Sequence, residues 1–372
     1  MRRRGEFYFI VFVAVISVLL FVLPTGYENP ELTDGKLWEK AEVVSVDDSD
    51  LGSISVVTLG AQSLELEVLS GEFRGERVVC SNELLGDKRR DIVYSQGDCV
   101  SVVLLLGAES GGIVEARVED FYRGDVELVL VLLFFGVLIV FAGRTGLKAA
   151  LSFIFTALCF WKLLIPAFLS GYSPFGVSLC VVFVTTSVVV LLVGGFSRRG
   201  VVALCGATLG VLLTALMAWV FGYYFKIPGT VQEYSDALIY SGFEALDFSS
   251  MFLSCVFISS AGAVMDVAMD IAASQSELAR QVPGISRRAL IRSGFNVARP
   301  VVGSMTTTLL FAYSGMFMFT FMAFMAQGVP IESIVNRGFI ASEILHTLVG
   351  SFGLVLVAPL TSLVGGFLMI ND

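Results

Sequence analysis

Residues 259–274 read Ser-Ser-Ala-Gly-Ala-Val-Met-Asp-Val-Ala-Met-Asp-Ile-Ala-Ala-Ser, and they belong to an apolar run that extends from about residue 246 to residue 271. A run of this length crosses the roughly 30 Å hydrocarbon core of a bilayer as an α-helix. At helical spacing, its small residues and its two aspartates share one stripe. The stretch therefore predicts a membrane-spanning helix with one face that is both close-packing and anionic.

Further apolar runs of similar length are distributed along the chain, of which 56% is apolar and only 15% charged. Together with a mean hydropathy of +0.83, this composition excludes an ordinary soluble protein. These runs cover residues 7–23, 128–142, 149–169, 177–196, 201–221, 301–326 and 348–370. We therefore expect an α-helical integral membrane protein with about eight transmembrane helices.

The first apolar run follows Arg2, Arg3 and Arg4 and has two interpretations, a cleaved signal peptide or a retained anchor helix. The run lacks a small-x-small cleavage site, and it is longer than a typical signal-peptide core. These features favour an anchor helix within residues 1–26. Either interpretation places residue 30 outside the cytoplasm.

Basic residues in the connecting segments predict the orientation, because cytoplasmic loops are enriched in Lys and Arg. With the N-terminus inside, the short outer loops contain only Lys226 and Arg337. The cytoplasmic segments then contain Arg2–Arg4, Arg144, Lys148, Arg198, Arg199, Arg280, Arg287, Arg288, Arg292 and Arg299. We therefore expect both termini in the cytoplasm.

Residues 27–123 differ from the rest of the chain in both period and charge. Apolar and polar residues alternate at 54–59, 64–68, 77–80, 100–106 and 113–118, and glycine-containing turns separate these segments, as in short β-strands. The segment also holds most of the acidic residues. We expect a small all-β, OB-like extracytoplasmic insert after the first helix, followed by a seven-helix membrane domain at 124–372. The acidic charge gives no support for nucleic-acid binding.

Two features of this insert suggest specific chemistry. The sequence Asp-Asp-Ser-Asp-Leu-Gly at 47–52 resembles the start of a calcium loop but lacks the closing glutamate, so a solvated turn is the better interpretation. Cys80 and Cys99 lie outside the predicted spans, where a disulfide can form if the strand register brings their Cα atoms within about 7 Å. The pair is a candidate disulfide.

Asp266 and Asp270 are the main functional candidates, because charged side chains within a span are energetically costly and rarely lack a role. Two carboxylates four residues apart can bind one cation or share a proton, and oxygen ligands suit hard cations such as H⁺, Na⁺ or Mg²⁺. In the alternative interpretation, both residues lie at the cytoplasmic interface, pair with Arg280 or Arg299 and end the span.

Other polar residues complete a predicted ion pathway. They are Ser259 on the same helix, Asn296, Thr306 and Thr307 near the next span, and Glu343 before the last one. Hydroxyls in a span can also bond to their own helix backbone, which is the alternative for each threonine alone. Glu343 and the chain's single histidine, His346, have a spacing used by metal-binding pairs, although a structural position at the outer interface is favoured for His346.

The sequence lacks a phosphate-binding loop, a zinc-ligand cluster and a nucleophile elbow. We therefore expect a protein that is not an enzyme and that uses no cofactor. The expected partners are the lipid bilayer, a small inorganic cation, and a second copy of the chain or a paralogous membrane protein.

Several motifs resemble the YibE/F family of bacterial multi-pass membrane proteins. They are Ser-Ala-Gly-Ala-Val-Met-Asp-Val-Ala-Met at 260–269, Gly-Ser-Met-Thr at 303–306, Leu-Leu-Phe-Ala-Tyr at 309–313, Glu343, Gly-Ser-Phe-Gly-Leu-Val-Leu at 350–356, and Pro-Leu-Thr at 359–361. The order of parts is similar too: an anchor, a small outer β domain and seven helices. The resemblance implies a multi-pass fold in the bacterial inner membrane, and it implies no particular activity.

The chain departs from the family pattern around the predicted ion pathway. Arg299 is followed by Pro300 where an aspartate is usual, Thr307 replaces an asparagine, and Asp270 replaces a small serine. Two hypotheses of function follow. The first is a secondary transporter or permease for an inorganic cation with Asp266 as its central ligand, and the second is a non-transporting scaffold or sensor that acts through the outer β domain.

Overall fold

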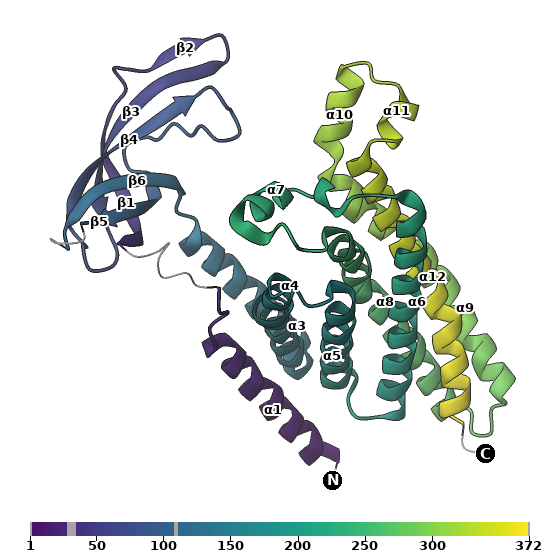
Figure 1. The fold of residues 1–372 in the computed structure, drawn as a ribbon. Coiled ribbons are helices and arrows are strands. Elements are labelled where there is room, and N and C mark those ends of the chain that lie inside the picture. The colour runs from purple at the N-terminus through teal and green to yellow at the C-terminus, as the bar shows by residue number, and fades with distance from the viewer. Residues whose placement is uncertain (1, 28–34, 108–110, 371–372) are drawn as a thin grey trace. The chain divides into compact units, whose positions relative to one another are not determined.

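The computed structural model describes residues 2–27, 35–107 and 111–370. The chain forms two compact units, which are described separately (Figure 1). One unit contains Met1–Thr25 and Leu138–Asp372, and the other contains Gly26–Val137. The first helix therefore belongs with the later helices, and the beginning of α3 belongs with the β domain.

The β unit is one antiparallel sheet with the strand order β2-β3-β1-β5-β6, and β4 pairs with β3. The strands are β1 (Lys36–Asp47), β2 (Gly52–Ile54), β3 (Val57–Val68), β4 (Arg77–Leu85), β5 (Cys99–Leu106) and β6 (Ile113–Phe121). Because β4 also contacts β6, the sheet curves into a half-barrel. Alternating residues such as Leu64, Leu66 and Val68 are fully buried inside it, as the period of two predicts.

A buried amide network fixes the interior of the half-barrel. Gln62 is completely buried, and its Nε2 donates to Asp48 Oδ1 at 2.8 Å and to the Tyr94 carbonyl at 2.9 Å. Its Oε1 accepts from the Tyr94 N–H at 3.0 Å and from Asn82 Nδ2 at 3.2 Å. Asp48 is thus engaged by Gln62, which agrees with a structural turn rather than a calcium loop at 47–52.

Long helices dominate the other unit (Figure 1). They are α1 (Arg2–Val22), α3 (Gly124–Cys159), α5 (Pro174–Gly194), α6 (Arg198–Phe225), α8 (Phe248–Gln281), α9 (Arg287–Met316) and α12 (Gly338–Leu368). Short helices are α4 (Ile165–Leu169), α7 (Ser235–Leu238), α10 (Met318–Ala326) and α11 (Ile331–Val335). Two π-helical segments, Phe160–Leu164 and Ile239–Phe243, and a 3₁₀ turn, Gly229–Val231, complete the described elements.

Among the described residues, six helices are long and apolar enough to cross a membrane, and a seventh is added if α9 and α10, bent by 62°, form one span. One of the six is the 46-residue segment Gly124–Leu169, which at 1.5 Å per residue is about twice as long as one span needs. Gly143 interrupts it with φ 55° and ψ −126°, a conformation open to glycine alone. The prediction of eight spans treats this segment as two membrane-spanning helices, one on each side of Gly143. The count of eight stays a prediction.

Glycines allow the central helices α6, α8 and α12 to pack closely. A Cβ atom at Gly210 would lie 2.6 Å from Val264 on α8 and 2.8 Å from Val357 on α12. Val264 and Val357 are both fully buried. At other levels Gly206 faces Thr361, and Gly353 faces Thr214. Small residues such as Gly206 and Gly210 on one face of α6 allow neighbouring helices to approach this closely.

Helix α1 docks on the helical unit through apolar and polar contacts. Val13 and Leu20 are buried in a cluster with Phe155 and Leu192. Lys162 Nζ donates to the Leu23 carbonyl at 2.8 Å, and thereby satisfies an acceptor just beyond the end of α1.

Candidate functional site

The structure distributes the predicted pathway residues over three neighbouring helices. Helix α8 carries Ser259, Asp266 and Asp270, α9 carries Asn296, Thr306 and Thr307, and α12 carries Glu343. Of this set, only Ser259 and Glu343 come together: Ser259 forms a hydrogen bond with His346, and a Glu343 oxygen lies 3.7 Å from the same imidazole. The predicted set therefore separates into a polar cluster and an exposed helix face.

The polar cluster consists of Ser259, Tyr313, Glu343 and His346. His346 Nε2 forms a hydrogen bond with Ser259 Oγ, and Tyr313 OH donates to the same oxygen at 3.0 Å. Glu343 Oε2 lies 3.7 Å from His346 Nδ1 on the other side of the imidazole ring. The tyrosine and histidine rings pack with their centroids 4.4 Å apart. Three helices thus hold one carboxylate, one imidazole and two hydroxyls together.

This arrangement can hold and transfer a proton. Ser259 Oγ also donates to the Val256 carbonyl at 3.0 Å, so it accepts from His346 Nε2. An imidazole that carries a proton on both nitrogens can therefore link the Ser259 hydroxyl to the Glu343 carboxylate. The side chains of Glu343 and His346 are 20% and 17% exposed. Such shielding strengthens electrostatic interactions within the cluster. The same oxygen and nitrogen atoms could also ligate a small cation.

Local sequence positions the cluster. Glu343 and His346 are three residues apart on α12, so their side chains share a face. Gly350 lies against Ser260, which brings α12 close to α8 one residue after Ser259. Sequence reasoning assigned His346 a structural position and did not identify Tyr313. Two signals were available for Tyr313: the motif at 309–313 that resembles the YibE/F family, and a stripe with Thr306 and Leu309 on one helix face.

Asp266 and Asp270 occupy an outward face of α8. Both residues are exposed in the unit, and neither has an ion-pair partner within 4.0 Å among the described residues. Arg280, one of the partners considered in the interfacial interpretation, instead pairs with Glu277. Asp266 follows Val264 by two residues, and Val264 packs on Gly210 near the middle of α6. Asp266 therefore lies near the middle of the helix bundle rather than at its end.

The hydroxyls on α9 bond to their own helix. Thr306 Oγ1 donates to the Val302 carbonyl at 2.8 Å, and Thr307 is exposed. This agrees with the alternative that was considered for a single threonine. Asn296 lines a groove of about 360 Å³ with Arg288, Arg292 and Arg299, apart from the polar cluster.

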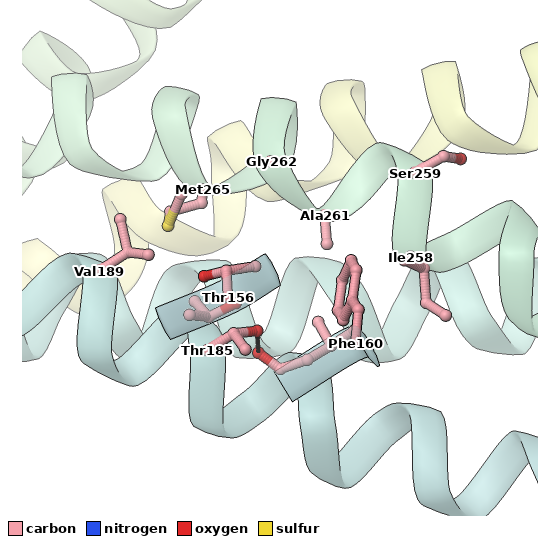
Figure 2. A pocket seen from close by; sticks show the side chains of 11 residues that line it. Thr156, Phe160, Thr185, Val189, Ile258, Ser259, Ala261, Gly262 and Met265 are labelled. Carbon is pink, nitrogen blue, oxygen red and sulfur yellow. Dashed lines mark hydrogen bonds between the residues drawn. The ribbon is translucent and has the colours of Figure 1, made fainter. Parts of the chain in front are cut away.

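A cavity of about 250 Å³ adjoins Ser259 between the π-helical segment Phe160–Leu164, α5 and α8 (Figure 2). Threonines 156, 185 and 186 provide most of its hydroxyls. Thr156 Oγ1 has no hydrogen-bond partner among the described residues. Figure 2 shows that the Ser259 hydroxyl points away from this cavity. Ser259 therefore forms a boundary between the threonine-lined cavity and the polar cluster.

No group of three or more His, Cys, Asp or Glu residues within the described ranges is arranged to hold a metal ion. Cys80 and Cys99 are free thiols on strands that do not pair with each other, β4 and β5. Cys80 is buried, and desolvation raises the pKa of its thiol to about 11.

This environment predicts different reactivity of the two thiols at pH 8. In a full-length chain whose four helix cysteines are serine, N-ethylmaleimide should modify Cys99 and leave Cys80 unmodified, because the thiolate is the reactive form. Mass spectrometry of Cys80→Ser and Cys99→Ser variants assigns the site. Protection of both cysteines until a reductant is added would instead establish the disulfide that the sequence suggested.

The two units together define a predominantly helical protein with several long apolar helices and a separate β half-barrel. A family model described as YibE/F-like protein matches residues 130–371. The chain therefore belongs to the YibE/F family, as its motifs indicated. No curated protein and no solved structure matches the chain.

Proposed function

We propose that this YibE/F family protein is a secondary transporter or permease for an inorganic cation. The observation that supports this function best is the cluster of Glu343, His346, Ser259 and Tyr313, which joins three helices through polar groups. Ionisable residues within membrane spans commonly mark ion pathways or proton relays. In this proposal, Glu343 and His346 bind the cation or proton, and Ser259 and Tyr313 orient the imidazole.

The face of α8 extends the proposed pathway toward the opposite end of the bundle. Asp266 and Asp270 follow Ser259 by two and three helical turns on the same stripe, about 10 and 16 Å along the axis. Asp266, the central ligand in the hypothesis from sequence, becomes a second binding position in this proposal. Catalysis is no part of this proposal, and neither is a cofactor.

The orientation expected from the basic residues is part of the proposal. Glu6 near the start of α1 forms an ion pair of 3.5 Å with Lys148, and Glu6 also lies 3.3 Å from the position of a Cβ on Gly195. Three segments assigned to the cytoplasm are thus neighbours. We infer a bacterial inner-membrane protein with both termini in the cytoplasm and residues 27–123 outside it.

The pairing of the β-strands supports the OB-like description of the insert. Counting β1 with β2 as one strand, the first strand pairs with the second and fourth, the second with the third, and the fourth with the fifth. This is the connectivity of a partly open five-stranded Greek-key barrel. We infer that the insert is an OB-like cap, and we assign it no ligand.

Flux measurements on the full-length protein in liposomes test the proposed function. We expect Glu343→Gln and His346→Ala to reduce cation flux at least tenfold across a panel of Na⁺, K⁺, Mg²⁺ and Mn²⁺ with and without a pH gradient. Asp266→Asn should reduce the flux of the same ion, because it removes the second charge in the pathway. Equal flux through the wild type and Glu343→Gln would contradict the role of the cluster.

Ser314→Ala provides a matched control near the cluster. The Ser314 hydroxyl donates to the Leu310 carbonyl of its own helix at 2.6 Å, and it makes no contact with His346 that the structure records. This variant should retain wild-type flux. If it lost flux as strongly as His346→Ala, the effect would reflect helix packing rather than the ionisable cluster.

A further inference from the structure

Charged side chains on the outer surfaces of α8 and α9 lack partners inside the chain. Asp266, Asp270 and Arg299 are all exposed. None of them forms an ion pair with any described residue, including one another. Against lipid, an unpaired charge at mid-depth is energetically costly. Something other than hydrocarbon must therefore face them if they lie within the membrane.

Helix contacts place the three charges at matching depths. Gly294 on α9 lies against Gln275 on α8, where a Cβ would be 2.7 Å from Gln275 Nε2. Asp270 precedes Gln275 by five residues, and Arg299 follows Gly294 by five. Both are therefore about 8 Å from this shared contact along antiparallel helices. Asp266 is one turn farther along α8.

The same contacts show that this level is well inside the bundle. Ser362 also touches Gly294, and the preceding residue, Thr361, faces Gly206. Gly206 lies eight residues after the start of α6 at Arg198, or about 12 Å along that helix. Moving about 8 Å farther inward reaches Asp270 and Arg299, about 20 Å from Arg198 and well inside a hydrocarbon core roughly 30 Å thick. Arg299 therefore lies deeper than the cytoplasmic segment to which the sequence assigned it, and the other basic residues of that segment still favour the same orientation.

A small residue next to Arg299 leaves room for another backbone. Gly303 lies one turn after Arg299, and a Cβ built there would meet no atom within 4 Å, in contrast to the tightly packed glycines of α6. Gly262, one turn before Asp266, instead lines the threonine-lined cavity beside α5. An exposed glycine such as Gly303 allows a helix from another molecule to approach closely.

We propose that a second copy of this chain covers the face of α8 and α9, with Arg299 of one copy against Asp266 and Asp270 of the other. Charge complementarity selects this occupant. Copies inserted in the same orientation are related by an axis along the membrane normal, so each residue keeps its depth. Arg299 of each copy then faces the aspartates of the other copy at about the same depth. Both copies use the same surface, as in an isologous interface.

This assembly satisfies charges that a single chain leaves unpaired. Removal of one partner from a buried pair is strongly destabilising, because it leaves an uncompensated buried charge. Asp266 then belongs both to this interface and to the proposed pathway, and crosslinking measures the interface without measuring flux.

Crosslinking between differently tagged copies tests the interface. In a chain without native cysteines, one copy carries Asp270→Cys and the other Arg299→Cys, and both are expressed in the same membranes. Copper phenanthroline with oxygen accepts the two electrons when two thiols join. We expect a disulfide-linked dimer with both tags, at least tenfold more abundant than in the control.

The control pairs Arg299→Cys with Leu209→Cys. Leu209 is 40% exposed on α6 at a comparable depth, and it should give no product. Light scattering of the unmodified protein in detergent provides a second measurement, with an expected mass of two 40.1 kDa chains. A single-chain mass together with no doubly tagged product would overturn the proposal. So would a crosslink to a different membrane protein.

Discussion

Replacing Gly210 with leucine is expected to destabilise the helical unit by about 3 kcal/mol or more, because it overpacks a rigid core. Even a single Cβ at this position would lie 2.6 Å from Val264 and 2.8 Å from Val357. Both valines are fully buried on different helices. Neither can move away without displacing α8 or α12, since a dense interior has few alternative side-chain positions.

Thermal unfolding of the full-length protein in detergent measures this effect. Gly136→Leu on α3 is the matched control, since a Cβ there would meet nothing within 4 Å. The Gly210 variant should unfold at a clearly lower temperature, whereas the control should remain close to the wild type. Equal unfolding temperatures for all three proteins would mean that α6, α8 and α12 do not pack as described.

Replacing Gln62 with leucine is expected to destabilise the β unit by about 2–4 kcal/mol. The buried amide forms four hydrogen bonds, two of them with the backbone of Tyr94. Leucine has a similar volume, but it would leave the Tyr94 N–H and carbonyl without these partners. A buried unsatisfied polar group carries its full desolvation penalty.

Hydrogen exchange of the full-length protein can localise this loss. Amides of β3 and of the segment around Tyr94 should exchange faster in Gln62→Leu, while those of α6 and α12 should not change. Glu83→Leu on β4 provides the comparison, because Glu83 is exposed and makes no hydrogen bond with Gln62. Unchanged exchange around Tyr94 in Gln62→Leu would contradict the assigned network.

Strand boundaries show one limit of sequence reasoning. Alternation at 54–59 predicts a single strand, whereas the structure ends β2 at Ile54 and begins β3 at Val57. Ser55 adopts a positive φ of 57° in the turn between them. Alternation records which side chains face inward, and a two-residue hairpin turn leaves that pattern largely intact. Only the pairing of β2 with β3 reveals the reversal.

The candidate site shows a different limit. Asp266 and Asp270 stand out in sequence because charge is rare in an apolar run. In the structure they lie on an exposed face of α8, where no described residue forms an ion pair with them. For His346 the sequence favoured a structural position at the outer interface, although its spacing from Glu343 is one that metal-binding pairs use. Its hydrogen bond with Ser259 joins residues 87 positions apart, and no local pattern encodes such a contact.

Sequence alone determined the long apolar helices, the alternating β insert and the acidic stripe on 259–274, because each depends on the order of residues within one element. Tertiary structure decided that Ser259, Tyr313, Glu343 and His346 meet, and that Asp266 lies at mid-depth on an outer face. Helix rotation and depth are set by packing contacts such as those of Gly210 and Gly350, which join distant segments. Hydropathy records that a helix is apolar, and only its neighbours fix the direction of each polar side chain.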